Sequence, residues 1–358
     1  MDSRAMEQKT KATEPIWRAG IIGLGFIGGG DQVSGDALGQ QVSHLDGTHV
    51  EALSRNKRIQ LVAGSSRDAG RRERFAQSTG CKTYADWRQM LARERLDMVS
   101  VATYAPVHAE MTVACAEHGV RAVYCEKPIA TRLADAERMV SACAKAGVLL
   151  VLNHNRRFNP NYRRLRDLIA EGRLGDLTSG SLRWGAGRLG NVGTHLVDAA
   201  CMLTGRSVRA VSGILDLSHK PDCRGPEFHD PGGFGWIQLD GGLMMAVDAA
   251  DYGKGKHCFI LNGTLGRAIT GGPDVTLEFW DGSSDHWPSP QGAPTSMDRA
   301  VGEIVDALEG RAPFPCEAMQ SVRTLETLIA FHASHAHHGA WVALPLKNGE
   351  RDIELQTA

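Results

Sequence analysis

The run Ile21-Ile22-Gly23-Leu24-Gly25-Phe26-Ile27-Gly28 decides the fold. It places three glycines in the spacing GxGxxG directly after a short apolar segment, Trp17–Gly23, that is typical of a strand. Glycines at these positions let the backbone turn tightly and approach a pyrophosphate, whose charge then lies at a helix N-terminus. Because the motif alone is weak, a Gly-rich turn in an ordinary α/β protein is the alternative. The context favours a dinucleotide-binding turn. Its expected cofactor contacts are Gly23, Gly25, Phe26, Ile27 and Gly28.

Outward from this turn, the first half of the chain alternates strand-like and helix-like segments. Helices are expected at Ala85–Leu96, from Pro106 to about Gly119, and from a cap at Thr131 to Gly147. Strands spaced by helices of this length are typical of a parallel, doubly wound sheet. We therefore expect a Rossmann domain over residues 15–152. Its expected strands are Trp17–Gly23, Arg58–Ser65, Asp97–Thr103, Arg121–Cys125 and Val148–Asn153.

The second half of the chain follows a different pattern. A helix is expected from about Thr194 to Gly205, and two more near Met297–Glu309 and Glu317–Ala336. Tight turns such as Asp240-Gly241-Gly242 join several β-like segments, which is typical of an antiparallel sheet. We therefore predict an α+β domain over residues 153–358. Its expected strands are Arg209–Leu215, Gly235–Leu239, Leu243–Ala249, Cys258–Asn262, Arg267–Thr270 and Thr276–Trp280.

The composition excludes several classes of protein. A length of 358 residues suggests about two domains, and 42% hydrophobic with 23% charged residues is ordinary for a globular protein. The net charge of −1 gives no general attraction to nucleic acid or membranes, and no apolar run approaches the roughly 20 residues of a membrane-spanning helix. The first fourteen residues lack the apolar stretch of a signal peptide, so a cytoplasmic location is expected.

The spacing between the glycines and the second strand is unusual. The residue that contacts the adenosine ribose is expected about 20 residues beyond the glycines, but here the second strand ends near Ser66, 38 residues after Gly28. The extra length falls in Gly29–Gly47, which we interpret as an inserted loop that covers the cofactor or meets a neighbouring subunit. Asp46 has about the expected spacing, but an Asp-Gly pair without a preceding β-like run is typical of a turn.

Two further segments carry side chains suited to proton transfer. Glu126-Lys127-Pro128 follows the strand Arg121–Cys125 at its C-terminal tip, where ligands bind in an open α/β sheet. A lysine there can hydrogen-bond a hydroxyl or carbonyl and stabilise a developing alkoxide, although a solvated surface turn is the alternative. Downstream, His195 opens a helix and Asn191 lies four residues before it, so both are expected on one face. A histidine of near-neutral pKa can take a hydroxyl proton as hydride leaves the same carbon, although alone it is more often a capping or core residue.

Together these segments resemble the glucose–fructose oxidoreductase / inositol dehydrogenase (Gfo/Idh/MocA) family of NAD(P)-dependent oxidoreductases. The resemblance runs from about Trp17 to Leu346. It implies a Rossmann domain followed by an α+β domain with a large open, mostly antiparallel sheet, through which many members form dimers or tetramers. The resemblance rests on five segments: the GxGxxG turn, the helix from Pro106 to Gly119, Cys125-Glu126-Lys127-Pro128, Asn155-Arg156-Arg157-Phe158-Asn159-Pro160 and Gly193-Thr194-His195-Leu196-Val197-Asp198.

The resemblance also implies roles for single residues. Lys127 would polarise the reacting oxygen, and His195 would be the general acid/base. Asn191 stands where many members have aspartate, and it can hydrogen-bond the substrate or orient His195 but cannot stabilise an imidazolium by charge. The substrate contacts expected on this basis are Asn191, Arg156 and Asp198. The further cofactor contacts are Ser66, Arg67, Thr103, Glu126 and Lys127.

The end of the second strand predicts the type of cofactor. Relatives that prefer NAD usually have a carboxylate at the position of Ser66, where it would repel a 2′-phosphate; serine can instead donate a hydrogen bond to that phosphate. Arg67 adds a guanidinium suited to phosphate oxygens. The alternatives are a solvated Arg67 and an Asp68 that serves NAD. We therefore expect NADP or NAD, with NADP favoured.

Two other clusters have simple interpretations. Four C-terminal histidines lack an HExxH motif or a carboxylate partner, so no metal site is predicted. They are His332, His335, His337 and His338.

A group of arginines interleaved with Phe158 and Tyr162 could indicate a nucleic-acid-binding surface, but the near-zero net charge favours one arginine in contact with the substrate and the rest in solvent. They are Arg156, Arg157, Arg163, Arg164 and Arg166. Eight cysteines without a CxxC pair are expected to be free.

These observations predict a dehydrogenase or reductase that moves a hydride between nicotinamide and a secondary alcohol or ketone of a sugar, cyclitol or related polyol. Two alternatives remain: an NAD-dependent glycosidase of the same family, and a dinucleotide-binding regulatory protein without turnover. Release of sugar from an aryl glycoside with no net change in the cofactor would indicate the first. Failure to turn over a broad polyol panel would indicate the second. Specificity is expected to depend on the loop Ser218–Gly233.

Overall fold

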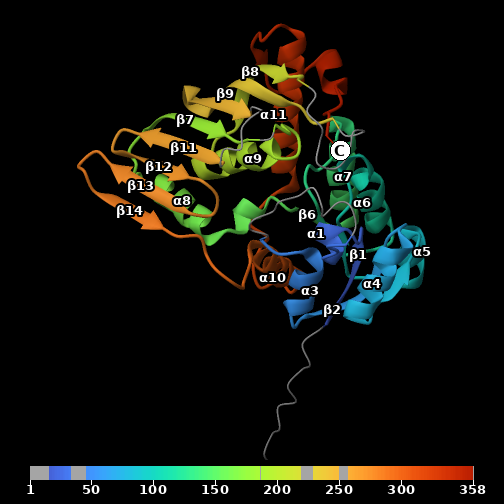
Figure 1. The fold of residues 1–358 in the computed structure, drawn as a ribbon. Helices are drawn as coiled ribbons and strands as arrows, with labels where there is room; N and C mark the ends of the chain where they lie inside the picture. Colours follow the sequence, from blue (N-terminus) through green and yellow to red (C-terminus); the bar gives the residue numbers. More distant parts are fainter. Residues whose placement is uncertain (1–15, 34–45, 186, 219–228, 250–256, 358) are drawn as a thin grey trace, which may run out of the picture.

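The computed structural model describes residues 16–33, 46–185, 187–218, 229–249 and 257–357, which form two sheets side by side (Figure 1). The first sheet has six parallel strands in the order β3-β2-β1-β4-β5-β6. This order confirms the predicted doubly wound sheet, with the strand order reversing beside β1. Its strands are β1 Trp17–Ile22, β2 Ile59–Ser65, β3 Lys82–Tyr84, β4 Met98–Val101, β5 Ala122–Cys125 and β6 Leu149–Leu152.

Helices cover both faces of this first sheet, which explains why its strands are continuous apolar runs. One face packs against α6 (His108–Glu117) and α7 (Leu133–Ala146), and the other against α3 (His49–Arg55). The predicted cap of α7 is wrong: the helix begins after Arg132, and the Thr131 hydroxyl donates instead to Glu354 at 2.9 Å. The helices α4 (Ala69–Thr79) and α5 (Trp87–Arg93) flank β3.

Within the described residues, the second sheet has nine strands in the order β14-β13-β12-β11-β7-β10-β9-β8-β15. All of its pairings are antiparallel except β7 with β10, as expected for a mostly antiparallel α+β domain. The strands are β7 Leu177–Arg183, β8 Val208–Asp216, β9 Gly232–Leu239, β10 Met244–Ala249, β11 Cys258–Gly263, β12 Gly266–Thr270, β13 Val275–Phe279, β14 Ser284–Trp287 and β15 Val342–Ala343.

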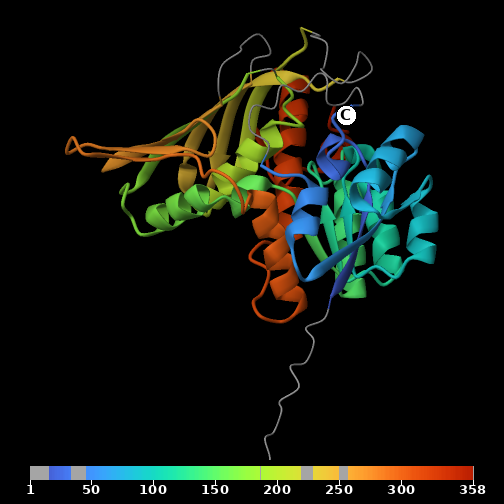
Figure 2. The ribbon, with the colours of Figure 1, turned by 60° about the horizontal axis from the view of Figure 1, so that its bottom comes forward.

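Three helices lie against one face of the second sheet, and no described helix covers the other face (Figure 2). They are α8 (Pro160–Ala170), α9 (Gly193–Thr204) and α11 (Ala318–Ala336). The helix α10 (Ser296–Leu308) follows the second sheet in the chain but packs beside α3, where Met297, Ala300 and Ile304 join the core under the first sheet. Within the described ranges, every helix is too short or too polar to span a bilayer.

Candidate active site

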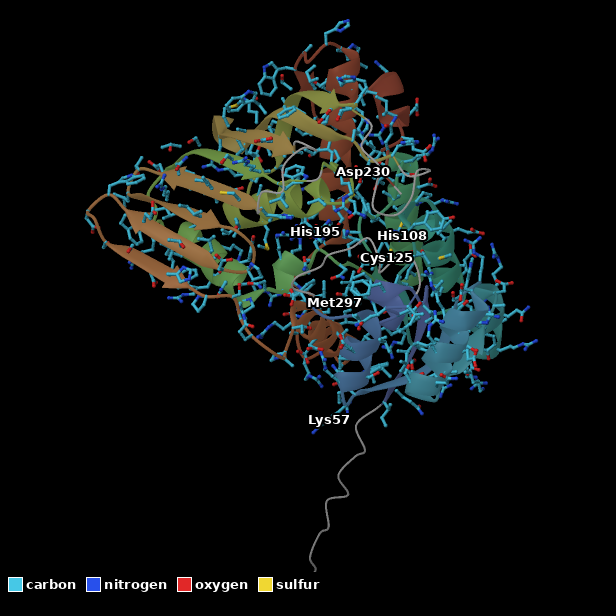
Figure 3. The ribbon with its side chains drawn as sticks, in the orientation of Figure 1. Lys57, His108, Cys125, His195, Asp230 and Met297 are labelled. Carbon is cyan, nitrogen blue, oxygen red and sulfur yellow. The ribbon has the colours of Figure 1, made fainter. Side chains whose placement is uncertain are left out.

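One cavity of about 1060 Å³ opens at the carboxyl ends of the strands in the first sheet and reaches the second domain. Most of the residues predicted from the sequence as a cofactor or catalytic site line it together. They are Gly23, Gly25, Phe26, Ile27, Ser66, Arg67, Thr103, Glu126, Lys127, Asn191 and His195. Gly28, Arg156 and Asp198 do not line it. In Figure 3, His195 from α9 lies between the two sheets, on the side of the first sheet where β5 ends at Cys125.

The glycine turn at the end of β1 has the geometry that a bound pyrophosphate needs. Gly23 has a φ of +99°, and a Cβ there would lie 2.3 Å from the carbonyl oxygen of Ala102. A Cβ on Gly28 would lie 1.9 Å from the carbonyl oxygen of Gly23, so helix and strand approach closely only because both residues are glycine. Gly25 caps the helix α1 (Phe26–Gly29) and faces the cavity. These are the three separate roles that glycines have in a dinucleotide-binding turn.

The segment after the glycines is unusual because α1 has only one turn and ends at Gly30 in the left-handed conformation. Asp31 then accepts two hydrogen bonds from Arg74 of α4, each 2.9 Å long. At the other end of the insertion, Asp46 accepts a hydrogen bond from the backbone N–H of Ser296 at 2.8 Å, at the start of α10. Asp46 and Gly47 both line the cavity. Residues 34–45 lie outside the described residues, so the predicted contact of this loop with cofactor or partner stays a prediction.

The end of the cavity beside β2 is rich in arginine. Ser66 and the exposed side chain of Arg67 line it, together with Arg71 and Arg88. The carboxylate of Asp68 accepts a hydrogen bond from the backbone N–H of Arg71 at 2.7 Å, and so caps α4. In this structure Asp68 therefore caps the helix while also lining the cavity.

Lys127 joins the two domains at the other end of the cavity. Its ammonium group donates to the backbone carbonyl and to the side-chain oxygen of Asn191, both at 3.2 Å. The loop that carries Asn191 is held by Asp230, whose carboxylate accepts from the backbone N–H groups of Gly190 and Asn191 at 2.8 Å each. Asp230 belongs to the segment Ser218–Gly233, of which residues 219–228 lie outside the described residues, and nothing in the local sequence distinguishes it from the other acidic residues there. Figure 3 shows it above His195.

His195 sits in the first turn of α9 with its Nδ1 buried and without a hydrogen-bond partner in the described part of the chain. Its ring lies edge-on to that of His154, with 6.0 Å between the centroids. Burial lowers the pKa of His195 well below 6.5, and the positive charges of Lys127 and Arg156 lower it further. The ring is therefore neutral near pH 7 and able to accept a proton.

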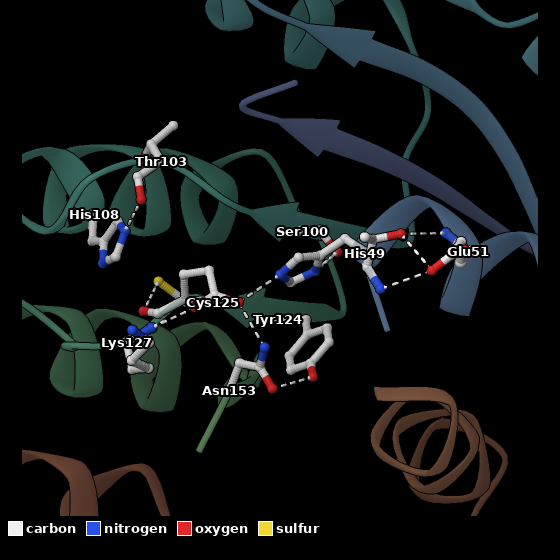
Figure 4. A network of polar contacts seen from close by, with 11 residues as sticks. His49, Glu51, Ser100, Thr103, His108, Tyr124, Cys125, Lys127 and Asn153 are labelled. Carbon is white, nitrogen blue, oxygen red and sulfur yellow. Dashed lines mark hydrogen bonds and ion pairs between the residues drawn. The ribbon is translucent and has the colours of Figure 1, made fainter. Parts of the chain in front are cut away.

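A buried polar network under the site fixes the strand end that carries Lys127 (Figure 4). Glu126 accepts a hydrogen bond from Asn153 at 2.6 Å and contacts the ring of His49 at 3.1 Å. His49 also contacts the hydroxyl of Ser100 at 3.0 Å, and Tyr124 donates to Asn153 at 2.7 Å. Burial alone would raise the pKa of Glu126, but His49, Lys127 and Asn153 together lower it to about 2. His49 and Asn153 were not predicted as site residues, because only the fold brings them to Glu126.

Asp198 is placed differently from the expectation that it contacts substrate. Its carboxylate is fully buried and accepts hydrogen bonds from the guanidinium of Arg157 at 2.8 to 3.0 Å. Since both oxygens are used and the residue does not line the cavity, Asp198 cannot reach a ligand there. The pair instead joins α9, which carries His195, to the turn Asn155–Phe158.

Comparisons with known proteins agree with this fold. Residues 17–154 match the family described as "Oxidoreductase family, NAD-binding Rossmann fold" (GFO_IDH_MocA). D-apiose dehydrogenase of Paraburkholderia graminis is 32% identical over 175 residues, which cover 49% of this chain and 42% of that protein. Myo-inositol 2-dehydrogenase of Thermotoga maritima is 31% identical over 159 residues, which cover 44% and 42%. The matched region is thus less than half the length of these relatives.

A solved structure extends the similarity of fold to the second domain. An inositol dehydrogenase homologue of Azotobacter vinelandii, complexed with NADH and myo-inositol, has a TM-score of 0.76 at 19% sequence identity. The match covers 92% of this chain and 98% of that one, so both sheets are shared. Together with the glycine turn and the strand order of the first sheet, these similarities identify residues 17–154 as an NAD-binding Rossmann domain of the Gfo/Idh/MocA oxidoreductase family.

Proposed function

We propose that this protein is an NAD(P)-dependent oxidoreductase that interconverts a secondary alcohol and a ketone on a sugar, cyclitol or related polyol. One observation carries the proposal: the glycine turn and the pair Lys127 and His195 line the same cavity. A bound nicotinamide would therefore share a space with a proton acceptor and a cation. The relatives named as apiose and inositol dehydrogenases support this class of substrate.

The residues of this chain would handle the proton and the developing charge. His195 is neutral near pH 7, so it can take the hydroxyl proton of an alcohol, and in the reverse direction its acidic imidazolium returns that proton. Lys127, held by Asn191, would stabilise the alkoxide as the proton leaves. Asn191 carries no charge, so its role is to orient Lys127 and to hydrogen-bond the substrate. Arg157 and Asp198 position α9 without touching the substrate.

The glycine turn fits a dinucleotide. A Cβ at Gly23 or Gly28 would collide with the backbone, so the turn can keep this shape only with glycine at both positions. Gly25, Phe26 and Ile27 would hold the pyrophosphate, while Thr103 and Glu126 would line the path toward the nicotinamide. When bound, the nicotinamide accepts or supplies the hydride. No described residue of the chain could do so.

The cofactor we propose is NADP rather than NAD. Ser66 and the exposed Arg67 line the cavity where the adenosine ribose would lie, and Arg71 and Arg88 add two further guanidinium groups. Asp68, the carboxylate that could accept ribose hydrogen bonds, caps α4 instead. A 2′-phosphate would thus meet the Arg67 guanidinium and the Ser66 hydroxyl, while Arg71 and Arg88, which pair with Asp31 and Glu110, would add positive charge nearby.

The NADP preference is tested by titrating the protein with NADPH and NADH and measuring both dissociation constants. Arg67→Ala should weaken NADPH binding about tenfold and leave NADH unchanged, because a charge-assisted hydrogen bond is lost. Ser66→Asp should shift the preference toward NADH. Arg93→Ala removes an exposed arginine that does not line the cavity and is the matched control. Tighter binding of NADH by the wild type would refute this preference.

The reaction itself is tested by incubating the protein with a polyol and sugar panel and either cofactor, while the absorbance of the reduced nicotinamide is followed. A net change that depends on His195 supports an oxidoreductase. Release of an aryl alcohol from a glycoside with no net change in the cofactor indicates a glycosidase. Cofactor binding with neither reaction indicates the regulatory alternative.

Two further features belong to the proposal. The outer face of β8 and β9 carries Ile214, Phe234 and Trp236 with exposed fractions of 43%, 38% and 48%, which is typical of a surface that pairs with a second copy. We therefore propose a homodimer or homotetramer.

We also propose a cytoplasmic location. The seven described cysteines, all of which are free thiols, support it.

A further inference from the structure

The arginine cluster that follows the first sheet divides into two kinds of residue. Four of its members have carboxylate partners. Arg157 pairs with Asp198, Arg163 with Glu303, Arg164 with Asp285, and Arg166 with Asp167. Arg156 has no hydrogen bond or ion pair with any described residue, and its guanidinium lies 5.9 Å from the ring centroid of Tyr162. A half-buried guanidinium is rarely left without an anion, because its charge is costly to desolvate.

The position of Arg156 relates it to the site. Its neighbour Asn155 lines the cavity, and the side-chain oxygen of Asn155 is buried without a hydrogen-bond partner among the described residues. The positive charge of Arg156 acts on the rings of His195 and His257, and the buried Nδ1 atoms of both rings also have no partner in the described ranges. Unpartnered polar atoms and an unpaired cation therefore gather beside the general base.

The carboxylates of the cavity do not neutralise this region. Glu126 is engaged by His49 and Asn153, and Glu110 pairs with Arg88. Asp46 and Asp68 hold the N-termini of α10 and α4. Asn191 is uncharged, and Lys127 lines the cavity. Arg156 does not line it in this structure, but it follows the lining residue Asn155, and its charge acts on the ring of His195. A ligand carboxylate that extends past Asn155 would meet this second cation. A neutral polyol would leave Arg156 without an anion.

We propose that the substrate is a sugar acid, whose carboxylate pairs with Arg156 while a hydroxyl elsewhere on its chain meets Lys127 and His195. The planar guanidinium matches a carboxylate through two parallel hydrogen bonds. Asn155 and His257 supply further hydrogen bonds to the same end of the ligand. This inference rests on the proposed function, because it names the substrate class of the same site.

The test compares matched compounds that differ only in the acidic group. D-Glucuronate, D-galacturonate and D-gluconate are set against D-glucose, D-galactose and D-glucitol, with NADP and NAD supplied, and D-glucose 6-phosphate is included as the phosphate arm. The wild type should favour the best acid over its neutral counterpart by at least about tenfold in kcat/KM, as expected for a charge-assisted pair. Arg156→Gln should abolish this preference by lowering kcat/KM for the acid alone. Arg156→Lys should restore part of it. Arg166→Gln, which removes an exposed arginine paired with Asp167, should retain the full preference.

The other outcomes are decisive. Equal turnover of acids and neutral compounds, or an equal loss for both in Arg156→Gln, overturns the carboxylate site and leaves the oxidoreductase proposal intact. A preference for the phosphorylated sugar overturns the assignment of a carboxylate. If no compound is turned over, the proposed function fails, and calorimetric titration of D-glucuronate into the cofactor complex tests the site alone. Binding that Arg156→Gln removes supports it, and absence of binding overturns it.

Discussion

Lys127 and His195 come from different domains and meet only across the cavity, so their removal tests the proposed chemistry directly. Lys127→Ala and His195→Ala should each lower kcat by about 100-fold or more, the range expected for a positioned acid/base group. Cofactor affinity should change far less, because neither loss alters the glycine turn. Steady-state kinetics with the best substrate, together with NADPH titration, measure both effects.

The matched control for this pair is Lys145→Ala, which removes an exposed lysine near the end of α7 without touching the cavity. Its kcat should equal that of the wild type. Wild-type turnover in either site variant would contradict the assigned roles.

The pH dependence of the reaction reports on His195. Oxidation of an alcohol needs the neutral ring, so kcat/KM should fall as the pH drops through the pKa of His195, which lies below 6.5 in the free enzyme. Burial and the cations Lys127 and Arg156 disfavour the imidazolium, and removing one cation must therefore raise this pKa. Arg156→Gln should move the acidic limb of the profile toward 6.5. A profile with a neutral polyol substrate isolates this effect from carboxylate binding, and an unshifted limb would show that Arg156 does not act on His195.

At the scale of elements, one buried ion pair sets the position of the helix that carries the general base. Arg157 in the turn Asn155–Phe158 donates to both oxygens of Asp198 in α9. Asp198→Ala would leave the guanidinium buried without its anion, a change that costs about 3–5 kcal/mol in free energy of unfolding. We expect a clear fall in the melting temperature, measured by circular dichroism at fixed pH.

The control for this prediction removes both charges at once. The double variant Arg157→Met, Asp198→Leu should recover most of the lost stability, since no unpaired charge stays buried. It should still turn over more slowly than the wild type, because the hydrogen bonds that orient α9 are gone. Equal destabilisation by the single and double variants would mean that packing, rather than charge, accounts for the effect.

The sequence predicted those elements whose pattern is strong and local. The buried strands β1, β2, β4 and β5 are continuous apolar runs, and their order along the chain with the intervening helices indicates a parallel sheet. The helix α4 was missed because it is mostly polar, with Phe75 its one fully buried side chain. Short edge strands such as β3 and β15 acquire their structure from a neighbouring strand, which no local pattern encodes.

The site was predictable to the same extent and for the same reason. Glu126, Lys127 and His195 stand in local motifs, so their chemistry could be predicted before their distance was known. His49 and Asp230 act through partners more than 35 residues away in the chain, and only the folded structure brings them together. Asp198 was predicted to contact the substrate, but it faces Arg157. Its position in the helix sequence does not reveal which face of the helix packs against another part of the chain.

For the whole molecule, the two domains are tied by more than the peptide at residue 153. The helix α10 completes the core under the first sheet, although it follows the second sheet in the chain. The last residues return as well: the backbone N–H of Leu355 donates to Thr131, and Thr357 contacts Asp230. The two domains are thus connected in three places: at residue 153, through α10 and through the last residues of the chain. We propose a domain boundary between residues 152 and 153. In this division α10 belongs to the second domain by its place in the chain and packs against the first domain.

The open face of the second sheet yields the last prediction. Trp236 lies opposite Ser212 on β8, and Ile214 opposite Phe234, so these large side chains share the face that no described helix covers. Burying them against a second copy would remove a large apolar area from water, the main driving force of association. Trp236→Glu places a charge there and should convert the oligomer to monomers in size-exclusion chromatography with light scattering. Leu265→Glu adds the same charge at an exposed turn between β11 and β12, several strands away, and should leave the oligomer intact. A monomeric wild type, or equal dissociation by both variants, would show that this face is not the interface.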